Sequence, residues 1–357
     1  MRRRYFLFVL PILFLCSCNR IVEQDFFPVP IETVDVPEKK VISLSDESFF
    51  CSSMPFSLIK DSVIVSLERG TDTHLVSVTD MAKDSIMGLF CQKGRANNEL
   101  LDCIPISELY SDSEENLCAD LVSYKDSRLF KWNISESLKS GKDVYDKIVE
   151  LKSGRGLFLP LMSLYRLDEK RIITRNSVRS PKEGSIHEPP AYEIYDTDSG
   201  QKMREYAFMN SVEAPDYDHD GYDDRAYVSM SDCIKPDRTK VAFAMSYMSV
   251  YGILDIESGK LDVFRVKRSR RFSATDRYRH FASLAADDSF IYALYRDGIS
   301  REALEAYSLL YVIDWQGKIR HLFTVESGIW SIDLDGDLLY FLKRDGCIKY
   351  IHTSELV

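Results

Sequence analysis

The sequence predicts an all-β protein, a six-bladed β-propeller built from four-stranded antiparallel blades, with an N-terminal strand completing the last blade. Three observations predict this fold. A polar turn followed by a short β-rich run recurs six times. A second phrase with the composition of a hairpin follows most of these copies. The ~320 residues after the N-terminal region exceed what one ordinary core organises, and four-stranded units repeating every ~40–50 residues are typical of propeller blades.

The N-terminus has the pattern of a signal peptide over residues 1–17. Three arginines at 2–4 precede an apolar run over 5–15, which is too short for a membrane-spanning helix of about 20 residues. The run ends in Leu15-Cys16-Ser17-Cys18, which resembles the bacterial lipobox. Cys18 is the better candidate for lipidation because small Ser17 precedes it. We therefore expect a lipid anchor in the cell envelope, at the outer membrane, with its orientation left open; an ordinary cleaved signal peptide is the alternative.

The mature chain is acidic. Without residues 1–17, which hold three arginines and no acid, the formal net charge falls from −10 to −13. This charge argues against nucleic acid as a partner, and against a membrane contact beyond the lipid anchor. Residues 18–40 are rich in proline and charge and predict a tether, so the propeller is expected over 41–357.

Cysteine spacing excludes two kinds of site. Six cysteines remain after Cys16 and Cys18, and none forms a CxxC pair, which argues against a zinc ribbon or a thioredoxin-type centre. A disulfide between Cys91 and Cys103 and buried free thiols both stay open.

The first phrase sets the number of blades. It occurs as "KDSVIVSL", "SEENLCADLVSY", "DEKRIITR", "PDRTKVAFAM", "DDSFIYALY" and "DGDLLYFLK". The first apolar residues of these runs are Val63, Leu117, Ile172, Val241, Phe290 and Leu338, at spacings of 54, 55, 69, 49 and 48 residues. Six copies predict six blades. The last copy leaves room for three strands, so we expect a strand near "KKVISLS" to complete it and close the ring.

Most of the mature chain resembles the TolB-like six-bladed β-propeller lipoproteins of Gram-negative bacteria. The stretches that carry the resemblance are "LFCQKGRANNEL", "YEIYDTDSG", "FIYALYRDG", "YVIDWQGKI" and "SIDLDGDLLYFL". The first departs from the family's Gly-Arg-Gly-Pro-x-Glu pattern, because Ala96, Asn97 and Asn98 stand where Gly-Pro is usual. The resemblance implies the fold and an envelope location, but it implies no catalytic activity.

An acidic stretch, "DYDHDGYDD", lies in the longest interval, between the third and fourth predicted blades. Its spacing matches the first part of a calcium loop, with candidate ligands Asp216, Asp218, Asp220, Tyr222 and Asp224. Tyr227 stands where a bidentate glutamate belongs. A structural calcium, a plain acidic turn and an ion-paired loop are the interpretations that stay open.

Basic residues mark the other predicted blade-to-blade connections. "FRVKRSRRFSATDRYRH" follows the fourth blade and is expected beside the acidic loop, with which it could pair. "CQKGRANNELLDC" and "KSGRGLFLPL" are glycine-containing connections whose backbone N–H groups and cations could cradle an anion. The candidate binding residues on this loop-rich face are Lys93, Arg95, Glu99, Lys152, Arg155, Arg268, Arg270 and Arg271.

Tests for catalysis find no motif. The chain has no G-x-S-x-G, H-E-x-x-H, P-loop or GxGxxG pattern, so no catalytic residue is assigned. The favoured hypothesis is a non-catalytic propeller that binds a protein, peptide or glycan. The alternative is a calcium-dependent hydrolase or lyase of the lactonase type, with its site at the central channel.

Calcium titration separates the interpretations of the acidic stretch. If it holds calcium, titration of the purified chain is expected to give heat and a higher Tm, because the ion binds the folded chain and reduces the repulsion among five clustered aspartates. Pairing with the basic run predicts neither effect. No heat and an unchanged Tm at millimolar calcium would eliminate the metal.

Overall fold

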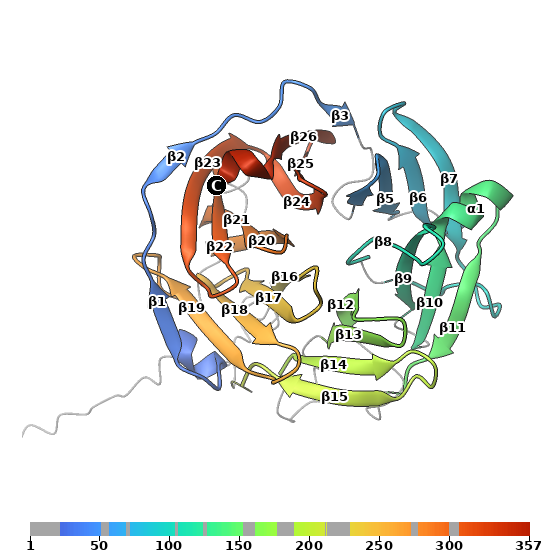
Figure 1. Ribbon diagram of the computed structural model, residues 1–357, viewed down its shortest axis with the longest axis horizontal. Helices are drawn as coiled ribbons and strands as arrows, with labels where there is room; N and C mark the ends of the chain where they lie inside the picture. The colour runs from blue at the N-terminus through green and yellow to red at the C-terminus, as the bar shows by residue number, and fades with distance from the viewer. Residues whose placement is uncertain are drawn as a thin grey trace, which may run out of the picture.

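Six sheets are arranged around a common centre, so the chain is a six-bladed β-propeller, as predicted (Figure 1). The computed structural model describes residues 22–50, 57–68, 72–103, 106–123, 127–152, 161–176, 189–210, 212, 229–272, 278–299 and 307–357. The first strand of each blade lies nearest the centre and the fourth lies at the rim.

The blades follow one another along the chain. Blade 1 consists of β4 (Ser57–Lys60), β5 (Val63–Leu67), β6 (His74–Asp80) and β7 (Ser85–Gln92). Blade 2 consists of β8 (Tyr110–Ser111), β9 (Leu117–Ser123), β10 (Arg128–Asn133) and β11 (Tyr145–Glu150). Blade 3 consists of β12 (Leu161–Arg166), β13 (Arg171–Asn176), β14 (Ala191–Asp196) and β15 (Lys202–Ala207).

The second half of the ring takes in strands from the N-terminus. Blade 4 consists of β16 (Met230–Ile234), β17 (Lys240–Met245), β18 (Val250–Asp255), β19 (Leu261–Val266) and β1 (Ile31–Val34). Blade 5 consists of β20 (Tyr278–Ala286), β21 (Phe290–Ile299), β22 (Tyr307–Asp314), β23 (Ile319–Ser327) and β2 (Lys39–Val41). Blade 6 consists of β24 (Ile329–Asp335), β25 (Leu338–Lys343), β26 (Cys347–His352) and β3 (Phe49–Phe50).

Each copy of the first phrase forms the second strand of a blade. Val63, Leu117, Phe290 and Leu338 begin β5, β9, β21 and β25, and the other two apolar residues come second in β13 and β17. Among the first four strands of each blade, neighbouring strands are antiparallel. The turns from first to second strand therefore lie on one face, the turn face, and the blade-to-blade connections enter the first strands on the other, the connection face.

Aspartate and glycine shape the predicted hairpin turns of blades 3 to 5. In "DTDSG", Asp196 Oδ1 accepts hydrogen bonds from the N–H groups of Asp198 (3.1 Å) and Ser199 (2.7 Å). Gly200 then adopts φ 69°, a left-handed conformation that glycine allows without strain. The turns "DIESG" and "DWQG" repeat this arrangement with Asp255 and Asp314.

One apolar cluster fills each of the six interfaces between blades. Aromatic and branched side chains alternate along the inner strands, so each sheet buries both of its faces against neighbours. The cluster between blades 3 and 4 is the largest, with twenty buried residues. The cluster between blades 2 and 3 has six, and no half-buried hydrophobic residue of the described chain packs against it.

The predicted tether over 18–40 is corrected for its described part, which lies against the propeller. A 3₁₀ helix (Glu23–Phe26) begins this strap, which we define as residues 22–50. Phe26 and Phe27 are 1% and 2% exposed in the core between blades 3 and 4. β1 and β2 then pair in parallel with β19 and β23 at the rim (Figure 1). Burial of these two phenylalanines explains why the proline-rich segment packs against the propeller.

The strand that completes blade 6 also differs from the prediction. β3 (Phe49–Phe50) pairs antiparallel with β26, whereas residues 39–41 of "KKVISLS" extend blade 5. Ser45 still contacts blade 6, where its N–H donates to the Tyr350 carbonyl at 2.9 Å. The strap thus covers the outer edges of three consecutive blades, and edges covered in this way cannot pair with another chain.

Helices are short in the described chain. The α-helix α1 (Ile134–Ser140) joins β10 to β11, and the 3₁₀ helix η4 (Thr353–Leu356) ends the chain. The Asn133 side chain caps α1 by accepting from the Glu136 N–H at 3.0 Å. No described helix has the length and apolar character that crossing a membrane requires.

Two aspartates of β24 hold blade 6 against blade 1. Asp333 Oδ2 accepts from the Ile59 N–H at 2.6 Å, and Asp335 Oδ2 accepts from the Asp61 N–H at 2.7 Å. Burial raises the pKa of Asp333 to about 7. The folded chain therefore binds this proton more tightly than the unfolded chain does.

The free energy of unfolding should decrease as pH rises, because Asp333 loses its proton. Its protonated form contributes stability that is fully present below about pH 4 and is lost as pH rises through about 7. Between these values we expect the wild type to lose at most about 4 kcal/mol relative to Asp333→Asn, which stays neutral. Urea unfolding across this range measures the difference, with Asp288→Asn on an exposed turn as control. Parallel curves for wild type and Asp333→Asn would contradict the assignment.

Candidate functional site

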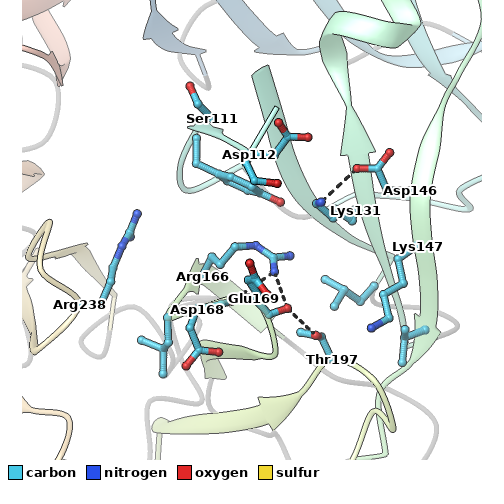
Figure 2. Close-up of a pocket in the computed structure, with 15 residues that line it drawn as sticks. Ser111, Asp112, Lys131, Asp146, Lys147, Arg166, Asp168, Glu169, Thr197 and Arg238 are labelled. Carbon is cyan, nitrogen blue, oxygen red and sulfur yellow. Dashed lines mark hydrogen bonds and ion pairs between the residues drawn. The ribbon is translucent and has the colours of Figure 1, made fainter. Parts of the chain in front are cut away.

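A cleft of about 670 Å³ opens between blades 2 and 3, the interface with the small apolar cluster. The first-to-second-strand turns of blades 2, 3 and 4 border it, so it opens on the turn face. They contribute Ser113, Asp168 and Arg238, and β10 and β11 form one wall (Figure 2). Apolar packing thus gives way to charged side chains at this interface.

Arg166 and Asp120 form a bidentate ion pair at the cleft. Arg166 Nε donates to Asp120 Oδ2 at 2.8 Å and Nη2 donates to Oδ1 at 2.6 Å. The Tyr110 hydroxyl donates to Asp120 Oδ1 at 3.2 Å, and the Arg166 guanidinium lies 5.0 Å from the Tyr110 ring centroid. Burial lowers the pKa of Arg166, but the charge of Asp120 outweighs it and raises that pKa overall. Burial raises the pKa of Asp120, and the charge and hydrogen bonds of Arg166 oppose that rise. The bidentate geometry holds the pair in one orientation.

Glu108 connects three blades beside this pair. Its Oε1 accepts from the backbone N–H of Arg166 in blade 3, and its Oε2 accepts from Arg238 Nη1 of blade 4 at 2.5 Å. Burial raises the pKa of Glu108, and the charge of Arg238 opposes that rise. The cleft is therefore braced by charge pairs that fix the relative positions of blades 2, 3 and 4.

Further ion pairs line the wall and rim. Lys131 Nζ lies 3.1 Å from Asp146 Oδ2, and Lys147 pairs with Asp198 of blade 3. Thr197 Oγ1 donates to the Glu169 carbonyl at 3.3 Å, which holds the rim turn of blade 3 (Figure 2). The exposed Glu169 carboxylate has no partner among the described residues, so it is available to a ligand.

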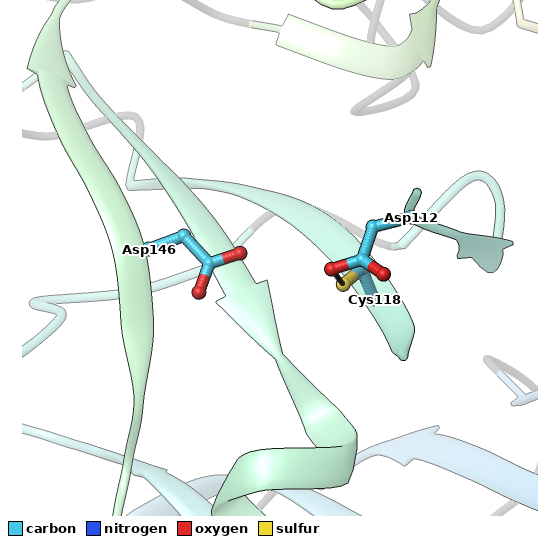
Figure 3. Close-up of side chains that lie close together, drawn as sticks. All are labelled: Asp112, Cys118 and Asp146. Atoms are coloured by element: carbon cyan, nitrogen blue, oxygen red, sulfur yellow. Dashed lines mark hydrogen bonds between the residues drawn. The ribbon is translucent and has the colours of Figure 1, made fainter. Parts of the chain in front are cut away.

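Asp112, Cys118 and Asp146 bring three metal-ligating atoms within 4.8 Å of one another (Figure 3). Burial and then the charge of Asp112 raise the pKa of Cys118 to about 12, so a metal would have to displace the thiol proton in order to bind the sulfur. The Cys118 thiol donates to Asp112 Oδ2 at 3.9 Å, and Asp146 has Lys131 as its counter-charge. Asp112 and Asp146 line the cleft, and Cys118 lies beside them.

The predicted anion loop after blade 1 is filled by the chain's own carboxylate. Glu99 Oε2 accepts from the Ala96 N–H at 2.8 Å, and a Cβ at Gly94 would lie 1.9 Å from that oxygen. Lys93 and Arg95 are exposed beside it. Glycine at 94 therefore makes room for Glu99, in the place where an external anion was expected.

The other described candidates lie apart from this loop. Lys152 is exposed, and its N–H donates to the Gly200 carbonyl at 2.7 Å at the outer side of blades 2 and 3. Arg268, Arg270 and Arg271 follow β19, so they lie across the ring from Lys93 and Arg95 (Figure 1). The predicted binding residues do not form one site.

Counter-charges for the basic run come partly from the strap. Arg265 Nε lies 3.4 Å from Glu23 Oε1, and Lys267 pairs with Asp35. The candidate calcium ligands Asp216, Asp218, Asp220, Tyr222 and Asp224 lie outside the described residues, as do Cys18 and Arg155. The described cysteines Cys91, Cys103, Cys118, Cys233 and Cys347 are free thiols.

Sequence reasoning missed the cleft because its residues come from separate segments between Glu108 and Arg238. No spacing links them, and the turns "SDSEEN" and "PDRTK" were interpreted only as strand connections. The sequence feature that could have indicated the cleft is the high density of charged residues in the turns of consecutive blades.

Comparisons with known proteins support the fold. No family's sequence model matches this chain, and no curated protein matches it. A member of the DUF4221 family from Bacteroides vulgatus is similar in structure, with 10% identity, TM-score 0.59, and coverage of 89% of this chain and 96% of that one. At that identity the likeness concerns the propeller fold alone, and the TolB-like resemblance stays a prediction.

Two further structures are more distant. BamB from Moraxella catarrhalis has 12% identity and TM-score 0.37, covering 82% of this chain and 81% of that one. A chain of the mitotic checkpoint complex has 8% identity and TM-score 0.44, covering 91% of this chain and 97% of that one. Neither similarity is close enough to bear on this protein's function.

Replacing one partner of the Arg166–Asp120 pair should lower the free energy of unfolding more than replacing both partners does. Asp120→Asn leaves Arg166 without its full charge partner and is expected to lower the free energy of unfolding by about 3–5 kcal/mol. Adding Arg166→Met should recover part of that loss. Urea unfolding measures both, with Asp262→Asn in the exposed Lys260–Asp262 pair as a control expected to change stability by under about 1 kcal/mol. A similar small loss for Asp120→Asn would contradict the interpretation.

Proposed function

We propose that the chain is a lipid-anchored, non-catalytic binding protein of the cell envelope, and that the cleft between blades 2 and 3 takes an extended peptide segment of a partner protein. The propeller supports a binding role, because loops and turns on a rigid ring present side chains at fixed positions. The observation that carries the proposal is a 670 Å³ cleft lined by fixed charges of both signs.

Charge pairing favours a ligand of low net charge. Lys131, Lys147, Arg166 and Arg238 each pair with a carboxylate. A strongly anionic ligand would have to compete with these carboxylates for the cations, and the shielded Arg166–Asp120 pair is costly to break. A peptide backbone can instead add hydrogen bonds to unused lone pairs and N–H groups without displacing a partner.

Aromatic exposure favours a peptide over a glycan. Sugar rings stack on open aromatic faces, and the aromatic residue that lines the cleft is Tyr110. The guanidinium of Arg166 covers the face of that ring. Among the described lining residues, polar and charged groups therefore dominate recognition.

Other parts of the proposal rest on the sequence. Lipidation at Cys18 would place the propeller at a membrane surface, with the strap leading directly into blades 4 to 6. Calcium on the acidic stretch would be structural. The hydrolase or lyase alternative needs polar ligands from several blades at the ring centre. The three-ligand group of the described residues comes instead from blade 2 alone, so no observation favours it.

Site-specific photo-crosslinking in cells that make the protein tests the proposal. A photo-reactive amino acid at exposed Glu169 on the cleft rim is expected to give a discrete product containing a partner peptide. The same amino acid at Lys260, on a distant exposed turn, should not. Lys147→Glu reverses a cleft charge and should reduce the product about fivefold, which corresponds to about 1 kcal/mol.

Lys260→Glu is the matched control for Lys147→Glu, since it makes the same charge change outside the cleft. The wild-type product should be in the membrane fraction, and Cys18→Ala should move the chain to the soluble fraction. Equal products from both positions, or a product unaffected by Lys147→Glu, would contradict the cleft assignment. A glycan in the product would contradict the peptide assignment.

A further inference from the structure

Two arginines of blade 5 lie on the connection face without a carboxylate partner among the described residues. Arg279 is the second residue of β20, and Arg296 lies near the end of β21. Tyr247, in the turn between β17 and β18, and Trp330, in β24, come from the neighbouring blades. All four are half-buried and lie at the strand ends that face away from the cleft.

Backbone carbonyls and an indole ring hold Arg296 in place. Its Nη2 donates to the carbonyls of Ile329 at 3.1 Å and Trp330 at 2.7 Å, and its guanidinium lies 5.4 Å from the Trp330 ring centroid. The Nε–H is buried and has no hydrogen-bond partner among the described residues. A buried donor left without an acceptor costs about 1–3 kcal/mol.

Arg279 is positioned by an aromatic ring alone. Its guanidinium lies 4.2 Å from the centroid of the Tyr247 ring, a cation–π contact that orients the group and leaves its N–H edges open. No carboxylate of the described residues pairs with it. Its charge is close enough to Arg296 that the two repel.

Other shielded arginines of this chain are paired differently. Arg166, Arg175, Arg238 and Arg265 have side chains 6–29% exposed, and each has a carboxylate within 3.4 Å. The chain carries an excess of acids, with a formal net charge of −10. The missing carboxylate beside Arg279 and Arg296 is therefore a local feature and does not reflect a shortage of acids.

The positive charges of Arg279 and Arg296 are unfavourable to each other when no anion is bound. Burial, together with the charge of Arg279, lowers the pKa of Arg296 to about 10. The two arginines lie on adjacent strands, since Arg279 pairs with Gly298 of β21, and their guanidiniums contact Tyr247 of blade 4 and Trp330 of blade 6. A bound oxyanion would satisfy the free Nε–H and neutralise the repulsion, and guanidinium groups match carboxylate and phosphate oxygens in a bidentate manner.

We propose that Arg279 and Arg296 form a binding site for an oxyanion, the carboxylate or phosphate group of a ligand, on the connection face. The site is separate from the cleft and does not depend on the peptide proposal. The cations of the cleft are paired with carboxylates of the chain, whereas no described carboxylate pairs with Arg279 or Arg296.

Anion titration of the purified full chain tests the site. Inorganic phosphate and succinate, each compared with sodium chloride at equal ionic strength, are added while Tm and heat of binding are measured. At least one of them is expected to bind and raise Tm. Arg279→Gln and Arg296→Gln should each weaken that binding about tenfold or more, which corresponds to about 1.4 kcal/mol.

Arg204→Gln is the matched control. Arg204 also donates to a carbonyl, that of Glu257 at 2.7 Å, and lies 4.9 Å from the Tyr206 ring centroid, but on the exposed rim of blade 3. It should leave anion binding unchanged. If Arg296→Gln folds poorly, the binding measured for Arg279→Gln tests the proposal. The Arg279 side chain contacts only an aromatic ring, and its removal relieves the repulsion with Arg296. The Tm of Arg279→Gln without anion should therefore equal or exceed that of the wild type.

The two anions distinguish the source of the oxyanion. Binding of phosphate alone supports a phosphate-bearing ligand, and binding of succinate alone or of both supports a carboxylate. Absence of binding by either anion would overturn the proposal. Binding that both arginine variants retain, or that Arg204→Gln also removes, would overturn it as well.

Discussion

Ring closure is the constraint on which the rest of the structure depends. Each blade buries both faces of its sheet, so any gap in the ring would expose an apolar cluster to water. The gap between blades 6 and 1 is closed by β3 on β26 and by Asp333 and Asp335 on the start of blade 1. The strap adds Phe26 and Phe27 to the core and covers three rim strands. A closed ring is rigid, and rigidity lets side chains from different blades hold fixed positions on its faces.

The two faces of the ring differ in how charge is arranged. On the turn face, the cleft brings together cations that already have acidic partners, such as Arg166 with Asp120, so geometry and not net charge decides what fits. On the connection face, Arg279 and Arg296 lie on adjacent strands without a described carboxylate partner, and there we propose that the charge of a ligand decides binding. Because the ring separates these surfaces, the two proposed sites would not compete for the same ligand.

Repetition made the fold predictable, because each copy of the repeated phrase imposes the same local structure; Val63 and Phe290 each begin a strand, as their phrases indicated. The prolines and charges of the strap indicate a tether, whereas the burial of Phe26 and Phe27 depends on a core formed by residues between 165 and 272. The sites could not be predicted for a related reason. The sequence around Arg296 and Tyr247 contains no recognisable motif. That no described carboxylate lies beside Arg296 can be seen only in the folded structure.

A designed disulfide between β3 and β26 tests ring closure most directly. Phe50 lies opposite Cys347 in the antiparallel pair, at a separation that a disulfide can bridge. In a Cys51→Ser background, Phe50→Cys should form a disulfide with Cys347 within one molecule under mild oxidation, as peptide mass spectrometry would detect, and should raise Tm. A free thiol at position 50, or disulfides only between molecules, would contradict a ring closed by the N-terminal strand.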